Sequence, residues 1–149
     1  MKMKNTFIIF LSLMAIMTSC SKEEKNAFVD DGSRYPVSES ELSPAKNVAY
    51  YFWEDYSNSS FITYYSFYLI PMLDTFSGFK GTWDDDRRKT VAKESYSYSI
   101  TNSILTLKYS SFEEVFVLEK AKNRPLQDGD RVYLNNIQYR VQISDSSNN

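Results

Sequence analysis

Histidine is absent from this 149-residue sequence, and cysteine occurs once, as Cys20. The lack of histidine excludes catalytic triads with an imidazole base and zinc sites with a histidine ligand. A single cysteine excludes an intrachain disulfide and a multi-cysteine metal site. With only four glycines and four prolines, the chain is neither collagen-like nor of low complexity. The 17 basic and 19 acidic residues give a formal charge of −2, which gives no indication of nucleic-acid binding.

The N-terminus has the layout of a secretory signal peptide, which we place at residues 1–19. Lys2 and Lys4 form a basic region, and an apolar run follows from Phe7 to Met17. At about 1.5 Å per residue this run is too short to cross roughly 30 Å of hydrocarbon, so a transmembrane helix is the weaker interpretation. Small polar residues then lead to Cys20.

The segment Met17-Thr18-Ser19-Cys20 resembles the lipobox of bacterial lipoproteins, although Met17 stands where that family usually has leucine. The resemblance implies cleavage before Cys20 and its lipidation by palmitate-like acyl chains, which would anchor the protein in the outer membrane. Each buried CH₂ contributes about 0.8 kcal/mol to membrane binding, so one acyl chain holds a protein weakly and two or three chains hold it firmly. The alternative is an ordinary signal peptide in which the cysteine has no role.

The residues after Cys20 predict a linker. Ser21-Lys22-Glu23-Glu24 resembles the surface-export signal of lipoproteins from the Bacteroidota, which implies exposure on the cell surface, although a plain polar linker is the alternative. Few apolar residues and two prolines predict a lipidated cysteine and flexible linker over residues 20–46. We expect one folded domain over residues 47–145 and a disordered tail over 146–149.

The sequence pattern predicts an all-β domain. Aromatic and β-branched runs separated by turn residues predict eight strands, and no segment after residue 46 predicts an amphipathic helix. We expect a small antiparallel up-and-down β-barrel or a sandwich of about eight strands. The predicted strands cover residues 48–55, 61–70, 79–83, 94–100, 104–109, 113–119, 131–134 and 138–143.

Two segments carry a family resemblance. Gly81-Thr82-Trp83 matches the Gly-x-Trp of the lipocalin superfamily, and Tyr98–Leu107 is similar to a hairpin of lipocalin-like domains in bacterial lipoproteins. The resemblance implies a barrel whose floor is closed by Trp83 and whose interior can hold a small apolar ligand. The sequence departs from the family because two strands precede the motif, and neither a Thr-Asp-Tyr motif nor a C-terminal helix follows.

Charged residues give little indication of catalysis or metal binding. Asp84-Asp85-Asp86 could hold Ca²⁺, but its spacing differs from an EF-hand and three basic residues follow, so a solvated loop is favoured. Adjacent carboxylates such as Glu113 and Glu114 point to opposite faces of a strand, which makes a carboxylate hydrolase the least favoured function. We therefore predict a protein that is not an enzyme and needs no cofactor or metal.

Aromatic side chains are the distinctive excess, with 12 Tyr, 10 Phe and 2 Trp. Ten of them fall between residues 50 and 68. One interpretation is a core of bulky residues. The other is an exposed platform for a glycan or a protein partner. If Tyr50 and Phe52 face inward, Tyr51 and Trp53 face outward. The candidate platform residues are Tyr51, Trp53, Tyr64 and Tyr68.

These observations favour a membrane-anchored, non-enzymatic lipoprotein that acts as a binding or interaction module at the cell envelope. The alternative is a lipocalin-like carrier of a small apolar ligand, which requires a hollow interior. The carrier hypothesis fails if five predicted inward-facing residues meet in the middle of the barrel, namely Tyr96, Tyr98, Leu105, Leu107 and Tyr139.

Overall fold

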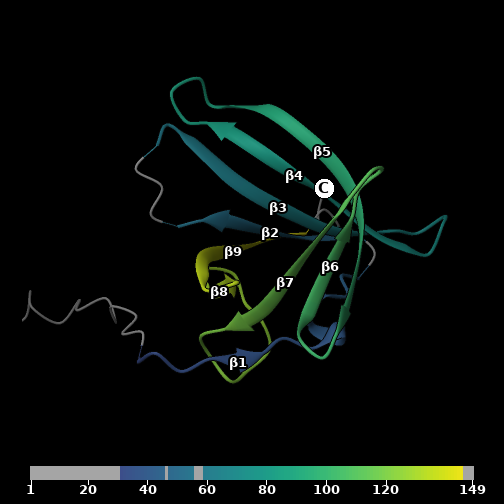
Figure 1. The fold of residues 1–149 in the computed structure, drawn as a ribbon, viewed down its shortest axis with the longest axis vertical. Coiled ribbons are helices and arrows are strands. Elements are labelled where there is room, and N and C mark those ends of the chain that lie inside the picture. Colours follow the sequence, from purple (N-terminus) through teal and green to yellow (C-terminus); the bar gives the residue numbers. More distant parts are fainter. Residues whose placement is uncertain (1–30, 46, 56–58, 146–149) are drawn as a thin grey trace, which may run out of the picture. The chain divides into compact units, whose positions relative to one another are not determined.

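A computed structural model describes residues 31–45, 47–55 and 59–145 (Figure 1). The described chain is all-β, with one short 3₁₀ helix and no α-helix. Within these ranges no helix is long and apolar enough to cross a membrane. The elements are β1 Tyr35–Pro36, η1 Glu39–Leu42, β2 Val48–Glu54, β3 Phe61–Ile70, β4 Thr75–Asp84, β5 Lys89–Thr101, β6 Ile104–Lys108, β7 Glu113–Lys120, β8 Arg131–Leu134 and β9 Ile137–Asp145.

Strands β2 to β9 form a closed up-and-down barrel. Each pairs antiparallel with the next along the chain, and β9 closes the ring by pairing with β2. Phe52 shows the closure, because it lies between Tyr65 of β3 and Val141 of β9. Of the two predicted architectures, the eight-stranded lipocalin-like barrel is confirmed. Closure leaves the barrel with fewer free edges than an open sheet would have.

For six of the eight predicted strands, both the first and the last residue lie within two residues of the observed bounds. β4 instead begins at Thr75, and β5 begins at Lys89 rather than at residue 94. The first half of β5, Lys89–Tyr96, pairs with β4 but not with β6, and most of it is exposed. The charged residues of this segment obscure the alternation of apolar and polar positions, so this part of the strand was not recognised in the sequence. Lysines are nevertheless well suited to a strand edge that has no pairing partner.

The predicted linker is wrong for residues 32–45, because the compact unit begins at Gly32. β1 pairs with the end of β7, and η1 follows it. Val37 and Leu42 are fully buried in the barrel core. The Leu42 carbonyl also accepts a hydrogen bond from the Tyr98 hydroxyl at 2.9 Å. Two apolar side chains are therefore enough to close one end of the barrel with a segment of polar composition.

The predicted signal peptide, Cys20, residues 21–30 and the tail 146–149 lie outside the described residues.

The barrel core combines the inward faces of all eight strands with Val37 and Leu42. Phe52 and Phe67 lie at its centre, with ring centroids 4.6 Å apart. The interior is therefore filled mainly by large apolar and aromatic side chains.

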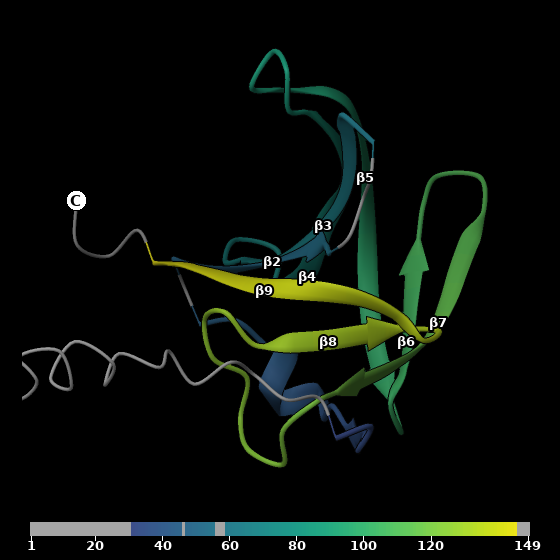
Figure 2. The same cartoon turned by 90° about the vertical axis from the view of Figure 1, so that its left-hand side faces the viewer.

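Strands β3 and β4 bend strongly along their length (Figure 2). At the middle of this pair the Tyr96 hydroxyl donates to the Ser66 carbonyl at 2.6 Å, and the Phe79 amide donates instead to the Ser66 hydroxyl at 2.9 Å. The Tyr96 ring lies over Gly78, where a side chain would collide with it. A glycine covered by an aromatic ring is a common device for curving a sheet.

Candidate functional site: an aromatic platform on the outer face

Strand alternation places two large aromatic residues of β2 outside the barrel. Phe52 is fully buried in the core, whereas its neighbours Tyr51 and Trp53 lie on the opposite face and are partly exposed. This outward orientation is the one that the sequence predicts. Because the core is complete without them, their size must be explained by what they contact outside the barrel.

Five rings gather on this outer face, and we call them the outer aromatic platform: Tyr51, Trp53, Tyr64, Phe79 and Trp83. Trp53 stacks on Tyr64 with centroids 4.4 Å apart and planes at 21°. Trp83 meets Trp53 edge-on at 6.0 Å, and Phe79 meets Tyr64 edge-on at 5.7 Å. Tyr51 lies 6.5 Å from Tyr64. Offset stacks and edge contacts are the favourable geometries for such rings.

Tyr64 forms the floor of the platform rather than its surface, since only 5% of it is exposed. Its ring lies across Gly81, where an added Cβ would come within 2.4 Å of two ring atoms and 2.6 Å of the hydroxyl oxygen. Its hydroxyl reaches Thr90 of β5 at 2.8 Å. The glycine of Gly81-Thr82-Trp83 therefore leaves room for Tyr64 to lie flat, and Trp53 rests on top.

The Gly-x-Trp tryptophan does not close the barrel floor as the lipocalin resemblance implies. Trp83 packs against Trp53 and donates from Nε1 to Asp85 at 3.3 Å. It lies at the β4 end that adjoins the β4–β5 turn, opposite to the end closed by η1. The predicted role is wrong because β4 is the third barrel strand here, whereas the family motif belongs to the first.

Polar side chains border the platform. Trp53 Nε1 donates to the Gln142 amide oxygen at 2.8 Å, and Lys93 Nζ lies 3.8 Å from the Phe79 ring centroid. Next to Trp53 in the sheet, Arg140 contacts Asp55 at 3.4 Å, and Asp55 also accepts from Gln138 at 2.9 Å. The aromatic surface therefore has an edge of amide, carboxylate and cationic groups.

Of the four predicted platform residues, the structure brings three together and separates the fourth. Tyr68 lines a different, open groove of about 430 Å³ with Ile70, Ser77 and Tyr96. Sequence reasoning missed Phe79, Trp83 and Lys93, which come from β4 and β5. Alternation puts Phe79 and Trp83 on the same face of one strand, but the sequence shows neither that this face is the outer one nor the register that places these residues beside β3.

The side chains that the structure describes pack together in the barrel interior. All five residues that would exclude a hollow barrel belong to one buried cluster: Tyr96, Tyr98, Leu105, Leu107 and Tyr139. Burial raises the pKa of Tyr96 and Tyr98 well above the ordinary tyrosine range, and neighbouring tyrosines raise it further. This packing argues against a carrier of the usual lipocalin kind.

The carboxylates proposed for catalysis are engaged by cations. Glu114 accepts from Lys80 at 2.8 Å and from the Tyr109 hydroxyl at 2.7 Å, whereas Glu113 lies 3.6 Å from Lys108. Burial, followed by the contact with Glu114, raises the pKa of Tyr109. Each of these two carboxylates therefore has a cationic partner.

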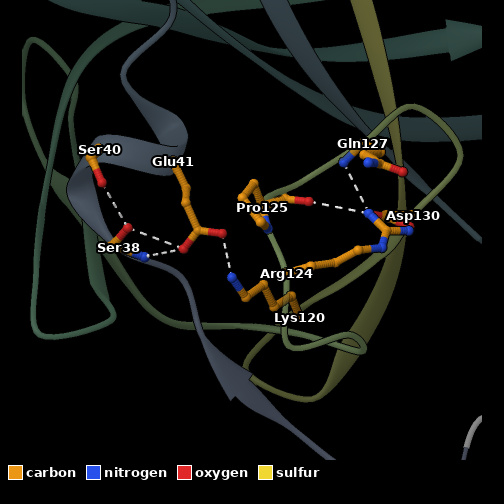
Figure 3. Close-up of polar contacts among 8 residues, drawn as sticks. All are labelled: Ser38, Ser40, Glu41, Lys120, Arg124, Pro125, Gln127 and Asp130. Carbon is orange, nitrogen blue, oxygen red and sulfur yellow. Dashed lines mark hydrogen bonds and ion pairs between the residues drawn. The ribbon is translucent and has the colours of Figure 1, made fainter.

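Two ion pairs at the closed end have an evident structural role (Figure 3). Glu41 of η1 binds Lys120 of β7, and both side chains are largely buried. Burial alone would raise the pKa of Glu41, but hydrogen bonds from Lys120 and Ser38 bring it below its ordinary value of 4.5. Arg124 holds Asp130 through two bonds of 2.7 and 2.8 Å, which fixes the β7–β8 loop.

The Asp84–Asp86 run behaves as a turn. Asp84 accepts from the Arg87 backbone amide at 3.0 Å, and its other oxygen lies 3.7 Å from the Arg87 guanidinium. Across the described part of the chain, no group of three or more Cys, Asp and Glu side chains is arranged to hold a metal ion.

Comparison with protein-family models, with curated proteins and with solved structures yields no match to this chain.

Proposed function

We propose that this protein is a non-enzymatic lipoprotein, anchored in the outer membrane through acylated Cys20, that binds its ligand on the outer aromatic platform. The observation that carries the proposal is the Trp53–Tyr64 stack flanked by Trp83 on the face of the barrel opposite to the core. Trp53 and Trp83 stay partly exposed although they pack against each other, and a group of apolar rings left open on an outer sheet face is typical of a binding surface.

The border of the platform favours a glycan as this ligand. A sugar ring offers an apolar CH face that can lie on an indole, while its hydroxyls need donors and acceptors at the sides. Gln142, Arg140 and Lys93 supply both kinds of group beside Trp53 and Phe79. A flat protein partner is the alternative occupant, for which tryptophan and tyrosine would serve as the anchors.

The test is binding of the mature chain, with Cys20→Ser, to immobilised envelope glycans. We expect Trp53→Ala to weaken binding at least about tenfold, the equivalent of roughly 1.4 kcal/mol. Val115→Ala is the matched control, because Val115 is an exposed apolar residue of β7, outside the platform. Unchanged glycan binding by the Trp53→Ala and Trp83→Ala variants would reject the platform. Capture of an envelope protein with no glycan binding would reassign its ligand.

The anchor is tested separately by metabolic labelling with a palmitate analogue. We expect the wild-type chain to be labelled and the Cys20→Ala variant to remain unlabelled. Label on Cys20→Ala would remove the anchor from the proposal. Digestion of intact cells with a protease distinguishes the cell-surface orientation, suggested by residues 21–24, from a periplasmic one.

The carrier alternative has a simple readout. Native mass spectrometry of the purified chain would show a lipid bound in fixed ratio if the barrel carried one. The packed interior leads us to expect the mass of the protein alone.

A further inference from the structure

The turn between β3 and β4 ends in two adjacent exposed apolar side chains. Met72 is 94% exposed and Leu73 is 69% exposed, the highest values among the large apolar residues that the structure describes. Single exposed apolar residues are ordinary, but a neighbouring pair at a projecting tip calls for a covering surface. The tip also has a defined shape, since the Leu73 amide donates to the Ile70 carbonyl at 3.1 Å.

This tip lies at the end of the barrel where the chain enters. Consecutive strands run in opposite directions, so the β3–β4 and β5–β6 turns share one end with β1 and η1. Phe76, two residues after the turn, lines an open groove together with Ser38, Glu39, Ser40 and Ser43 of the η1 region. The base of the hairpin therefore adjoins the segment that leads back toward Cys20.

We propose that the Met72–Leu73 tip inserts into the interface of the lipid bilayer that holds the anchor. This inference rests on the proposed acylation of Cys20. Only eleven residues lie between Cys20 and Gly32, where the compact unit begins, and a flexible chain of that length has a root-mean-square span of roughly 20 Å. A domain held so close to the bilayer by its η1 end can bring the tip on that same end into contact with lipid.

The contact is apolar rather than electrostatic. Between Ile70 and Thr75 the only charged residue is Asp74, and no basic residue is present. A chain cleaved before Cys20 has 15 basic and 19 acidic residues, a formal charge of −4, so anionic lipid would not attract it. Methionine is flexible and suits an irregular acyl environment. The tip therefore acts as a second, salt-insensitive membrane contact that orients the domain.

The experiment places a fluorescent probe at the tip. Residues 20–149 carry Cys20→Ser and an N-terminal hexahistidine tag, which tethers them to vesicles of phosphatidylethanolamine, phosphatidylglycerol and a nickel-chelating lipid. Met72→Cys then supplies the only thiol, and it is labelled with an NBD fluorophore. Ile137→Cys is the matched control, because Ile137 is also exposed but begins β9 at the opposite end of the barrel.

We expect the probe at residue 72 to shift to shorter emission wavelengths and to be quenched by brominated lipids, in low and high salt alike. The probe at residue 137 should remain water-like. Adding Leu73→Asp should abolish the shift at residue 72. A water-like probe at 72, or equal quenching at 72 and 137, would overturn the proposal. Because the tag replaces the acyl anchor, this result is independent of whether Cys20 is acylated, which the palmitate label decides.

Discussion

Replacing Gly78 with alanine tests whether the bend in β3 and β4 depends on a missing side chain. A Cβ at this position would lie 1.8 Å from the Ser66 carbonyl oxygen and 2.6–2.8 Å from the Tyr96 ring. The same carbonyl accepts the buried Tyr96 hydroxyl at 2.6 Å. The added methyl group would therefore occupy the space in which the two strands and the tyrosine meet.

The expected cost is large because the nearest obstacle is backbone. Overpacking a core typically costs about 1–3 kcal/mol. Displacing Tyr96 would also leave the Ser66 carbonyl or the Tyr96 hydroxyl unsatisfied, at about 1–3 kcal/mol more. We expect Gly78→Ala to lower the free energy of unfolding by about 3–5 kcal/mol. For a domain of this size the melting temperature should fall by roughly 10–20 °C.

Urea unfolding followed by circular dichroism measures the effect, with Gly81→Ala as the matched control. At Gly81 the three atoms nearest to an added Cβ all belong to the outer end of the Tyr64 side chain, at 2.4–2.6 Å. Because these obstacles are side-chain rather than backbone atoms, Tyr64 can shift at the expense of its hydrogen bond to Thr90, so we expect a smaller cost of about 1–2 kcal/mol. The reasoning is refuted if Gly78→Ala unfolds like wild type, or if Gly81→Ala is the more damaging change.

Three further predictions concern the closed end and the tyrosine core. Leu42→Ala should lower the free energy of unfolding by about 2–4 kcal/mol by urea titration, because it empties a fully buried site, and an unchanged midpoint would show that η1 does not close the barrel. The lowered pKa of Glu41 stabilises the fold above pH 4.5, and this contribution is lost as the pH falls below that value. Acid titration of the unfolding free energy should therefore be flatter for Glu41→Gln than for wild type, and equal slopes would refute the assignment. Tyr96 and Tyr98 have raised pKa values in the folded state, so stability should fall as the pH rises above about 10, where unfolded tyrosines ionise. Spectrophotometric titration should show tyrosines that ionise only on unfolding, whereas complete ionisation of the folded protein near pH 10 would contradict their burial.

The barrel strands were predictable because one side of each faces a packed interior. Tyr96, Tyr98 and Ile100 are buried, while the serines between them face outward, as period-two alternation predicts. The closing segment was not predictable in this way. Val37 and Leu42 stand five residues apart in a polar stretch and have neither a helical nor a strand period. Their burial depends on a barrel end formed by distant residues, including Lys120, which binds Glu41.

The platform shows where sequence reasoning stops. Alternation correctly predicts that Trp53 faces outward. Which ring lies beneath Trp53 depends on the register between β2 and β3, which sets Trp53 opposite Tyr64. The pairing of β3 with β4 then sets Tyr64 opposite Gly81. A shift of two residues between β2 and β3 would keep every side chain on its present face. It would nevertheless set Trp53 opposite Ile62 or Ser66, and the stack would be lost. The platform is therefore a property of register, and aromatic composition alone could not distinguish its members from Tyr68.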